Sequence, residues 1–160
     1  ATAVTMKTLP AIIAGVCLLL AASCRRGERD YSRWASLPSE GWAYGDTLSL
    51  IPADTTLTDN DSIVSRTLLL GVVHSAAYPY SNLWLEVTYH GTGYLYRDTV
   101  NMPLADIYGR WLGSGFGSSY QREITLKPRA DIDLTRPVDV RHIMRLDTLR
   151  NIERIGITVE

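Results

Sequence analysis

Few side chains in this sequence have the types and the spacing that metal binding requires. The three histidines are His74, His90 and His142. None of them lies in an H-x₃-H or H-E-x-x-H spacing and no cysteine accompanies them, so we predict no zinc site. Asp54–Ser62 contains three aspartates, which suit calcium, but it lacks the glycine and the closing glutamate of an EF-hand loop. We therefore interpret this segment as a solvated turn.

Nucleophile and phosphate chemistry also find little support. Gly113–Ser119 is rich in glycine and serine, but it lacks the Lys-Ser/Thr ending of a phosphate loop and precedes a strand, which favours a hairpin loop. His90–Gly93 is similar to the oxyanion loop of esterases, yet no G-x-S-x-G nucleophile elbow accompanies it. The 17 acidic residues are scattered, so no carboxylate pair for sugar hydrolysis stands out. We expect a protein that is not an enzyme and has no cofactor.

Cys24 carries the clearest chemical signal in the chain. Leu9–Ala22 is almost wholly apolar, too short for a spanning helix of about 20 residues and typical of a signal-peptide core. Small residues lead from this run to Cys24, and Arg25 opens a charged stretch. This order is typical of a bacterial lipoprotein signal, in which the cysteine is acylated, with palmitate for example, and the chain is cut just before it. An ordinary secretory signal with a chance cysteine is the alternative.

The signal defines the expected organisation of the chain. Residues 1–23 form the predicted signal peptide, with residues 1–5 upstream of a start at Met6, residues 24–42 the lipidated cysteine and a tether, and residues 43–160 the folded domain. Cys17 lies in the removed segment, so the mature chain holds one cysteine and no internal disulfide. Arg25 directly after the cysteine favours the outer membrane, with the inner membrane as the alternative.

The composition describes an ordinary globular body. The formal net charge is -1, which does not mark the chain for nucleic acid. Hydrophobic residues make up 46% and charged residues 21%, as in folded domains rather than disordered ones. The 160 residues, less the signal, suffice for one domain with a core, but not for two.

Beyond Gly41 the hydrophobic pattern repeats every two residues, which is typical of β-strands. Seven strands are expected, at Asp46–Ile51, Arg66–His74, Leu83–His90, Tyr94–Asn101, Tyr120–Leu126, Val138–Met144 and Ile155–Val159. One or two short helical turns are expected, around Pro103–Ile107 and Thr148–Arg154. Seven to eight short strands without a long amphipathic helix predict an all-β fold, an antiparallel β-sandwich of the immunoglobulin-like or jelly-roll kind.

Aromatic residues are the best candidates for a contact surface. The chain contains four tryptophans and nine tyrosines. Exposed Trp and Tyr side chains are typical of protein-contact or sugar-stacking surfaces, but these residues are also common in sandwich cores, so both interpretations stay open. The candidate partner-binding residues, with an arginine as a fixed hydrogen-bond donor, are Tyr78, Tyr80, Trp84, Trp111 and Arg145.

Several short motifs occur in a characteristic order along the chain. They are Tyr78-Pro79-Tyr80-Ser81-Asn82-Leu83-Trp84-Leu85, Asp98-Thr99-Val100, Leu104-Ala105-Asp106, Gly109-Arg110-Trp111-Leu112-Gly113-Ser114-Gly115, His142-Ile143-Met144-Arg145-Leu146-Asp147-Thr148-Leu149 and Ile155-Gly156-Ile157. Together with Cys24 they resemble the gliding motility lipoprotein GldH family, from about Tyr31 to Glu160. One departure is Asn151, where the family tends to have glycine; asparagine tolerates a left-handed backbone, so the turn is expected to persist.

The resemblance implies a lipid-anchored, non-enzymatic accessory or scaffold protein of the bacterial cell envelope. The family is tied to gliding motility and to type-nine protein secretion, so envelope and gliding-machinery proteins are the implied partners. The resemblance implies no catalytic residue in this chain. The alternative from the residues alone is a glycan-binding envelope lipoprotein with an aromatic platform. An envelope hydrolase is a third hypothesis, which lacks a nucleophile paired with a base.

Overall fold

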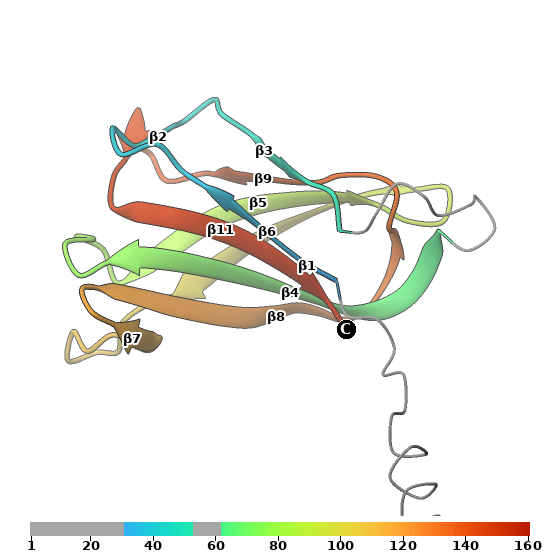
Figure 1. The fold of residues 1–160 in the computed structure, drawn as a ribbon. Helices are drawn as coiled ribbons and strands as arrows, with labels where there is room; N and C mark the ends of the chain where they lie inside the picture. The colour runs from blue at the N-terminus through green and yellow to red at the C-terminus, as the bar shows by residue number, and fades with distance from the viewer. Residues whose placement is uncertain (1–30, 53–61) are drawn as a thin grey trace, which may run out of the picture.

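The protein is an antiparallel β-sandwich. In the computed structural model the described residues are 31–52 and 62–160, and every element among them is a strand (Figure 1). The strands are β1 (Tyr31–Ser36), β2 (Trp42–Ala43), β3 (Leu48–Leu50), β4 (Ile63–Ser75), β5 (Asn82–His90), β6 (Leu95–Pro103), β7 (Ser114–Phe116), β8 (Ser119–Asp133), β9 (Val138–His142), β10 (Thr148–Leu149) and β11 (Ile152–Val159).

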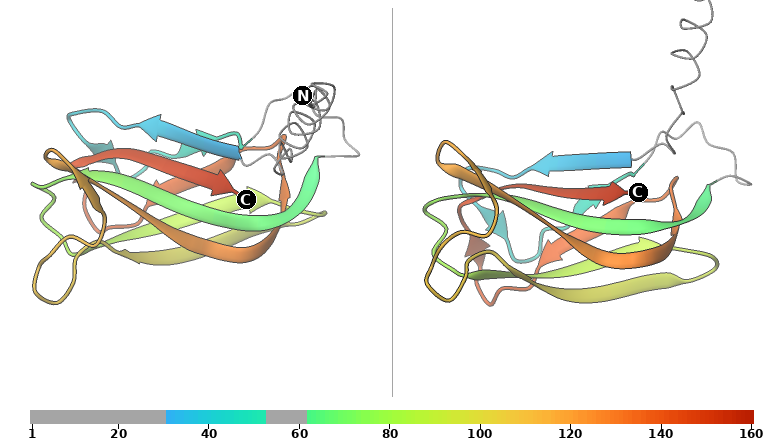
Figure 2. Two further views of the ribbon diagram at one scale, coloured as in Figure 1. Left: turned by 60° about the horizontal axis from the view of Figure 1, so that its bottom comes forward. Right: turned by 90° about the horizontal axis from the view of Figure 1, so that it is seen from below.

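Two sheets form the layers of the sandwich. One has five strands in the order β1-β11-β4-β8-β7, and the other has four in the order β3-β9-β5-β6. A two-stranded ribbon of β2 and β10 lies beside them. The two views of Figure 2 show the layers face to face. The all-β antiparallel sandwich predicted from the two-residue period is therefore confirmed.

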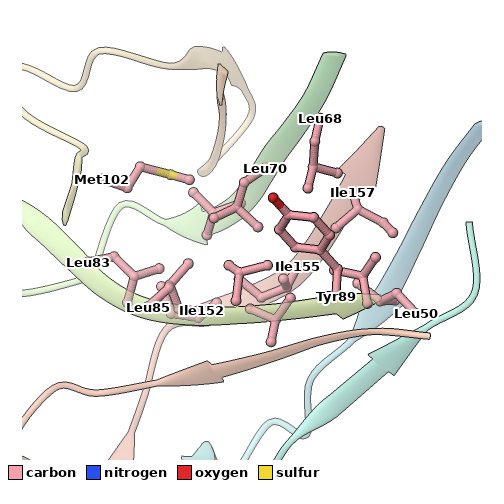
Figure 3. Close-up of a cluster of buried hydrophobic side chains, with 14 of the residues drawn as sticks. Leu50, Leu68, Leu70, Leu83, Leu85, Tyr89, Met102, Ile152, Ile155 and Ile157 are labelled. Atoms are coloured by element: carbon pink, nitrogen blue, oxygen red, sulfur yellow. The ribbon is translucent and has the colours of Figure 1, made fainter. Parts of the chain in front are cut away.

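The two-residue period of the strands places every second side chain between the two sheets. In β5, Leu83, Leu85 and Val87 are fully buried, and they pack against Leu68 and Leu70 of β4 within one apolar core. Figure 3 shows Leu, Ile and Met side chains from both sheets filling this space. The alternation read from the sequence thus reports burial directly, because successive side chains of a strand point to opposite faces.

Trp34 covers the outer face of the five-stranded sheet. It lies opposite Gly156 of β11, and Gly156 lies opposite Gly71 of β4. A Cβ at either glycine would collide with the indole ring, so the two glycines form the flat bed on which Trp34 rests. The guanidinium carbon of Arg154 lies 5.3 Å from the ring centroid, on a cation–π contact. This cover explains why a strand with few aliphatic residues joins the sheet.

The folded body begins earlier than the sequence predicted. Strand β1 pairs with β11 along its whole length, from Tyr31 opposite Val159 to Ser36 opposite Arg154. The predicted tether of residues 24–42 and domain start at residue 43 therefore differ from the structure, in which the sheet includes the chain from Tyr31 onward. Local sequence did not reveal this strand because its partners lie more than a hundred residues away.

All seven predicted strands are present, and both predicted helical turns are wrong. Residues 103–105 leave the end of β6 in an extended path, with the N–H groups of Leu104 and Ala105 both bonded to the Ser81 carbonyl, and residues 107–108 form a non-helical turn. Residues 148–154 belong to β10 and β11. The three-residue spacing of Leu149 and Ile152 arises from a tight turn at Asn151, whose φ is 67°, and not from helical periodicity. Asparagine therefore holds the left-handed position, as expected.

Candidate functional site

Most of the predicted aromatic group gathers at one end of the sandwich, around a buried histidine. His74, the penultimate residue of β4, has its ring centroid 4.5 Å from that of Trp111, 5.7 Å from Tyr78 and 5.8 Å from Tyr120. Tyr80 packs edge-on against Tyr78 at 5.5 Å. We call this end, defined by the His74 cluster and the loops around it, the aromatic end.

Burial governs the chemistry of this cluster. His74 Nδ1 donates to the Ser75 carbonyl at 3.0 Å, and Nε2 is buried without a hydrogen-bond partner. Burial lowers the pKa of His74, since the charged ring would lose its hydration. The hydroxyl of Tyr78 donates to the Asn82 carbonyl at 3.0 Å, and burial raises its pKa well above the usual range. Both groups are therefore neutral near pH 7. The cluster is an uncharged structural support, and we call it the base of this end.

A short loop stands on this base. The loop follows the end of β6, and its stem is an antiparallel bridge between Ala105 and Trp111. Within the loop the Asp106 N–H donates to the Arg110 carbonyl at 2.9 Å, and the Gly109 N–H donates to the Asp106 carbonyl at 3.0 Å. Gly109 has a φ of 78°, a conformation that favours glycine. The backbone of residues 105–111 is therefore closed on itself.

The Asp106 carboxylate braces the loop from within. Oδ1 accepts hydrogen bonds from the N–H groups of Tyr108 and Arg110, each at 2.9 Å, and Oδ2 accepts from Arg110 Nε at 2.7 Å. Hydrogen bonds from Arg110, backbone first, together with that from the Tyr108 N–H, lower the pKa of Asp106. The Arg110 guanidinium also lies 5.4 Å from the Tyr108 ring centroid. One ionised carboxylate thus holds the backbone of both Tyr108 and Arg110 in place.

The braced loop displays apolar side chains to solvent. Ile107 is 91% exposed and Tyr108 is 77% exposed. At the same end, Phe116 is 91% exposed at the tip of the β7–β8 hairpin, whose Gly117 has a φ of 63°. The Ala76 N–H donates to the Ser118 carbonyl at 2.7 Å, which ties this tip to the β4–β5 turn. Exposed apolar groups on a fixed backbone are typical of protein-contact surfaces.

Trp84 and Arg145 lie apart from the His74 cluster. Trp84 stands on the outer face of the four-stranded sheet and is 41% exposed. Its backbone N–H donates to Met144 Sδ at 3.4 Å. Arg145 is exposed beside Tyr44 and Asp147, along a shallow pocket. The structure therefore joins Tyr78, Tyr80 and Trp111 in a packed cluster but does not bring the candidate residues onto one exposed platform.

The remaining candidate segments have structural explanations. The Gly113–Ser119 segment forms the β7–β8 hairpin, as predicted. His90–Gly93 lies at the β5–β6 turn, which is closed by the Gly91 N–H donating to the Tyr94 carbonyl at 2.9 Å. His142 is buried, donates from Nε2 to the Trp42 carbonyl at 3.0 Å and has its pKa lowered by burial. Cys24 and nearly all of the Asp54–Ser62 segment lie outside the described residues.

Within residues 31–52 and 62–160, no three His, Cys, Asp or Glu side chains are grouped so that they would hold a metal ion. These residues also include no helix with the length and apolarity to cross a bilayer.

Sequence reasoning missed Ile107, Tyr108 and Phe116, the most exposed apolar residues of this end. A signal for the first two was present, because an aspartate and a glycine flank them, and these residue types favour turns. An apolar residue inside a turn has no strand face to occupy, so it is expected on the surface. The prediction instead favoured the tryptophans, because large aromatic residues are prominent in contact surfaces as a class.

The fold and the site define an antiparallel β-sandwich that carries apolar side chains on short, braced loops at one end. A family model described as GldH lipoprotein matches residues 29–159, so the chain belongs to the GldH lipoprotein family. The resemblance inferred from the motifs is therefore confirmed, and membership supports a lipid-anchored protein of the cell envelope associated with gliding motility. A comparison with curated proteins gave no match.

Proposed function

We propose that this protein is a non-enzymatic accessory or scaffold component of a cell-envelope complex that serves gliding motility and type-nine protein secretion. The observation that carries the proposal is the braced loop of residues 105–111, which holds Ile107 and Tyr108 out from the aromatic end. The contact is with an envelope protein, and the protein transforms no substrate.

The construction of the loop supports a role in binding. Binding energy at protein interfaces is concentrated in a few residues, and tyrosine is enriched among them. A loop that is already ordered loses little conformational entropy when a partner binds, because its backbone and its brace are in place beforehand. Trp111 supports the loop at its stem. Its half-buried ring packs on His74, and its backbone forms the bridge to Ala105.

The anchor is proposed at Cys24. The apolar run before it, the small residues leading to it and membership of a lipoprotein family support acylation of its sulfur and cleavage just before it. Several acyl chains would hold the protein durably on its membrane, whereas one chain gives only marginal binding. Arg25 supports the outer membrane as the site of anchoring.

A photocrosslinking experiment in gliding cells tests the contact site. A photoreactive amino acid at Tyr108 is expected to give a small number of defined adducts with envelope proteins. Thr99 is the matched control, since it is also exposed but lies on β6 away from the loop. Identical adducts from both positions, or normal gliding and normal secretion after deletion of the gene, would contradict the proposal.

A further inference from the structure

A second set of exposed apolar residues lies at the opposite end of the sandwich. Tyr94 is 73% exposed, Leu95 is 56% exposed and Ile63 is 42% exposed. They line one shallow depression together with His90 and with the ion pair of Arg136 and Asp133, in which Arg136 Nε lies 3.5 Å from Asp133 Oδ2. We call Ile63, Tyr94 and Leu95 the end patch.

The end patch lies where the chain enters the sandwich. Tyr31 pairs with Val159, and Leu68 of β4 pairs with the same residue, so Ile63 lies beyond the end of β11, where β4 still pairs with β8. Figures 1 and 2 show the start of β1, the end of β11 and the β5–β6 hairpin at one end of the molecule. The aromatic end lies at the far end of β4, whose thirteen residues span about 40 Å at 3.3 Å per residue.

The hairpin that carries the patch has a fixed position. A side chain at Gly91 would collide with the Asp131 backbone and with the Tyr96 ring, so the turn packs closely on β8. Tyr96 stacks on the buried Tyr89, with ring centroids 5.1 Å apart and planes at 15°. The exposure of Tyr94 and Leu95 is therefore built into the fold.

The length of chain before Tyr31 places this end close to the membrane. Six residues lie between Cys24 and Tyr31, and the seven Cα–Cα steps that join the two reach at most about 25 Å when fully extended. An acylated Cys24 would lie in the bilayer surface, so the end of the sandwich at Tyr31 cannot move far from the lipid headgroups. This constraint rests on the anchor at Cys24 in the proposed function.

The sheet faces within the same reach carry ion pairs and hydrogen bonds, and fewer large exposed apolar side chains than the end patch. On the four-stranded sheet, Arg141 Nε donates to Glu86 Oε1 at 2.8 Å, and Arg97 lies 3.9 Å from the same oxygen. On the five-stranded sheet, Thr158 donates to Glu123 Oε2 at 3.3 Å. Among the described surfaces near Tyr31, the end patch is thus the one suited to contact with acyl chains.

We infer that the end patch docks on the lipid surface to which the protein is anchored, so that the sandwich stands upright with its aromatic end directed away from the membrane. Tyr94 lies at the headgroup level and Leu95 and Ile63 contact the acyl boundary, as tyrosine and aliphatic residues do at membrane interfaces. Arg136, whose Nε lies 3.5 Å from Asp133 Oδ2, borders the same depression. The upright position presents Ile107 and Tyr108 to partner proteins.

Depth measurements on the acylated full-length protein test the inference. The protein is reconstituted in vesicles of phosphatidylethanolamine and phosphatidylglycerol that contain lipids with a nitroxide near the headgroup. Thr92→Cys and Tyr108→Cys variants carry a fluorophore, and vesicle flotation reports the anchor separately. We expect several-fold stronger quenching at position 92, in the turn beside the patch, than at position 108.

A pair of double variants identifies the patch as the cause. In the Thr92→Cys protein, Tyr94→Ser with Leu95→Ser should abolish most of the quenching, whereas Ile107→Ser with Tyr108→Ser, a more exposed apolar pair at the other end, should leave it unchanged. Flotation with equal quenching at both labels, or with no loss in the Tyr94/Leu95 variant, would overturn the docking inference alone. Loss of flotation in the unsubstituted protein would overturn the anchor and the docking together.

Discussion

The two ends of the sandwich both expose apolar side chains, but they are built for different surfaces. At the aromatic end, Ile107 and Tyr108 project from a narrow loop braced by Asp106. At the other end, the side chains of the end patch lie side by side along one shallow depression. A projecting pair suits a pocket in a partner protein, whereas a broad patch close to the tether suits a lipid surface. Exposure alone therefore does not define a function; the shape and the position of the exposed group do.

The ends also differ in what supports them. The loop at the aromatic end stands on a cluster that includes a buried histidine, His74, while the β5–β6 hairpin is held by a tyrosine stack and by the close approach of Gly91 to β8. Acid, and truncation of Trp111, should therefore disturb the first end and spare the second.

Trp111→Ala should produce the largest loss of stability. It removes a half-buried ring that packs on His74 and Tyr120, and we expect a decrease of about 2–4 kcal/mol in the free energy of unfolding, somewhat below the range for a fully buried tryptophan. Denaturant unfolding measures the change. Tyr108→Ala, which removes an exposed ring three residues earlier, is the control and should leave stability nearly unchanged. Equal stability of the two variants would show that Trp111 is not part of the base.

Mild acid should loosen the aromatic end first. His74 and His142 each have one ring nitrogen buried without a partner, and burial lowers both pKa values below 6.5. The unfolded chain therefore binds more protons than the folded one, so stability is complete above pH 6.5 and falls as the pH drops below it, by at most about 1.4 kcal/mol per pH unit for each histidine.

Hydrogen exchange at pH 7.5 and pH 5.5 locates this acid effect. Amides of β4 near His74 should lose protection at pH 5.5, while amides of the β5–β6 hairpin should change less. A His74→Phe variant should show a weaker dependence on pH than the unsubstituted protein. A uniform loss of protection at both ends would contradict a local origin in the buried histidines.

Asp106→Ala should separate order in the loop from stability of the fold. The substitution removes the two backbone hydrogen bonds and the ion pair that brace the loop, so the Tyr108 and Arg110 amides should exchange faster and crosslinking from position 108 should fall several-fold. The unfolding midpoint should barely move, because the carboxylate lies at the surface. Glu40→Ala, which removes another exposed acid, should change neither measurement.

The smallest effect on stability is expected at the end patch. Tyr94→Ser with Leu95→Ser replaces exposed side chains only, so the free energy of unfolding should change by no more than about 0.5 kcal/mol per site. Thermal unfolding in detergent checks this value. A large loss of stability would show that the patch belongs to the core and would remove the basis for its role on the membrane.

Much of the fold was predictable because burial alternates along a single strand. In β5, the buried Leu83, Leu85 and Val87 occupy every second position, and the sequence shows the strand without any knowledge of its neighbours. Strand β1 carries no such pattern. Its place depends on pairing with β11 and on the Trp34 ring resting over Gly71 and Gly156, contacts that link positions far apart in the chain.

The candidate site was predictable only in part. Residue types singled out Tyr78, Tyr80 and Trp111 as candidates for a contact surface, and the structure packs the three together, but the same residue type serves in a core and on a surface. Tyr78 is buried and Trp84 is not, although both are large aromatic residues within one motif. Burial of these rings depends on which turns cover them, and the turns are placed by contacts such as that of Ala76 with Ser118.

By itself the sequence determined the strand period and the family, since each of these is written in neighbouring residues or short motifs, and it predicted a lipoprotein signal at Cys24 and a mature chain without an internal disulfide. Only the tertiary structure decided which aromatic side chains are buried, which loop presents Ile107 and Tyr108, and that the end patch lies beside the start of β1. The physical reason is that alternation fixes the two faces of one strand, whereas the ends of a sandwich are assembled from turns whose neighbours are set by long-range pairing.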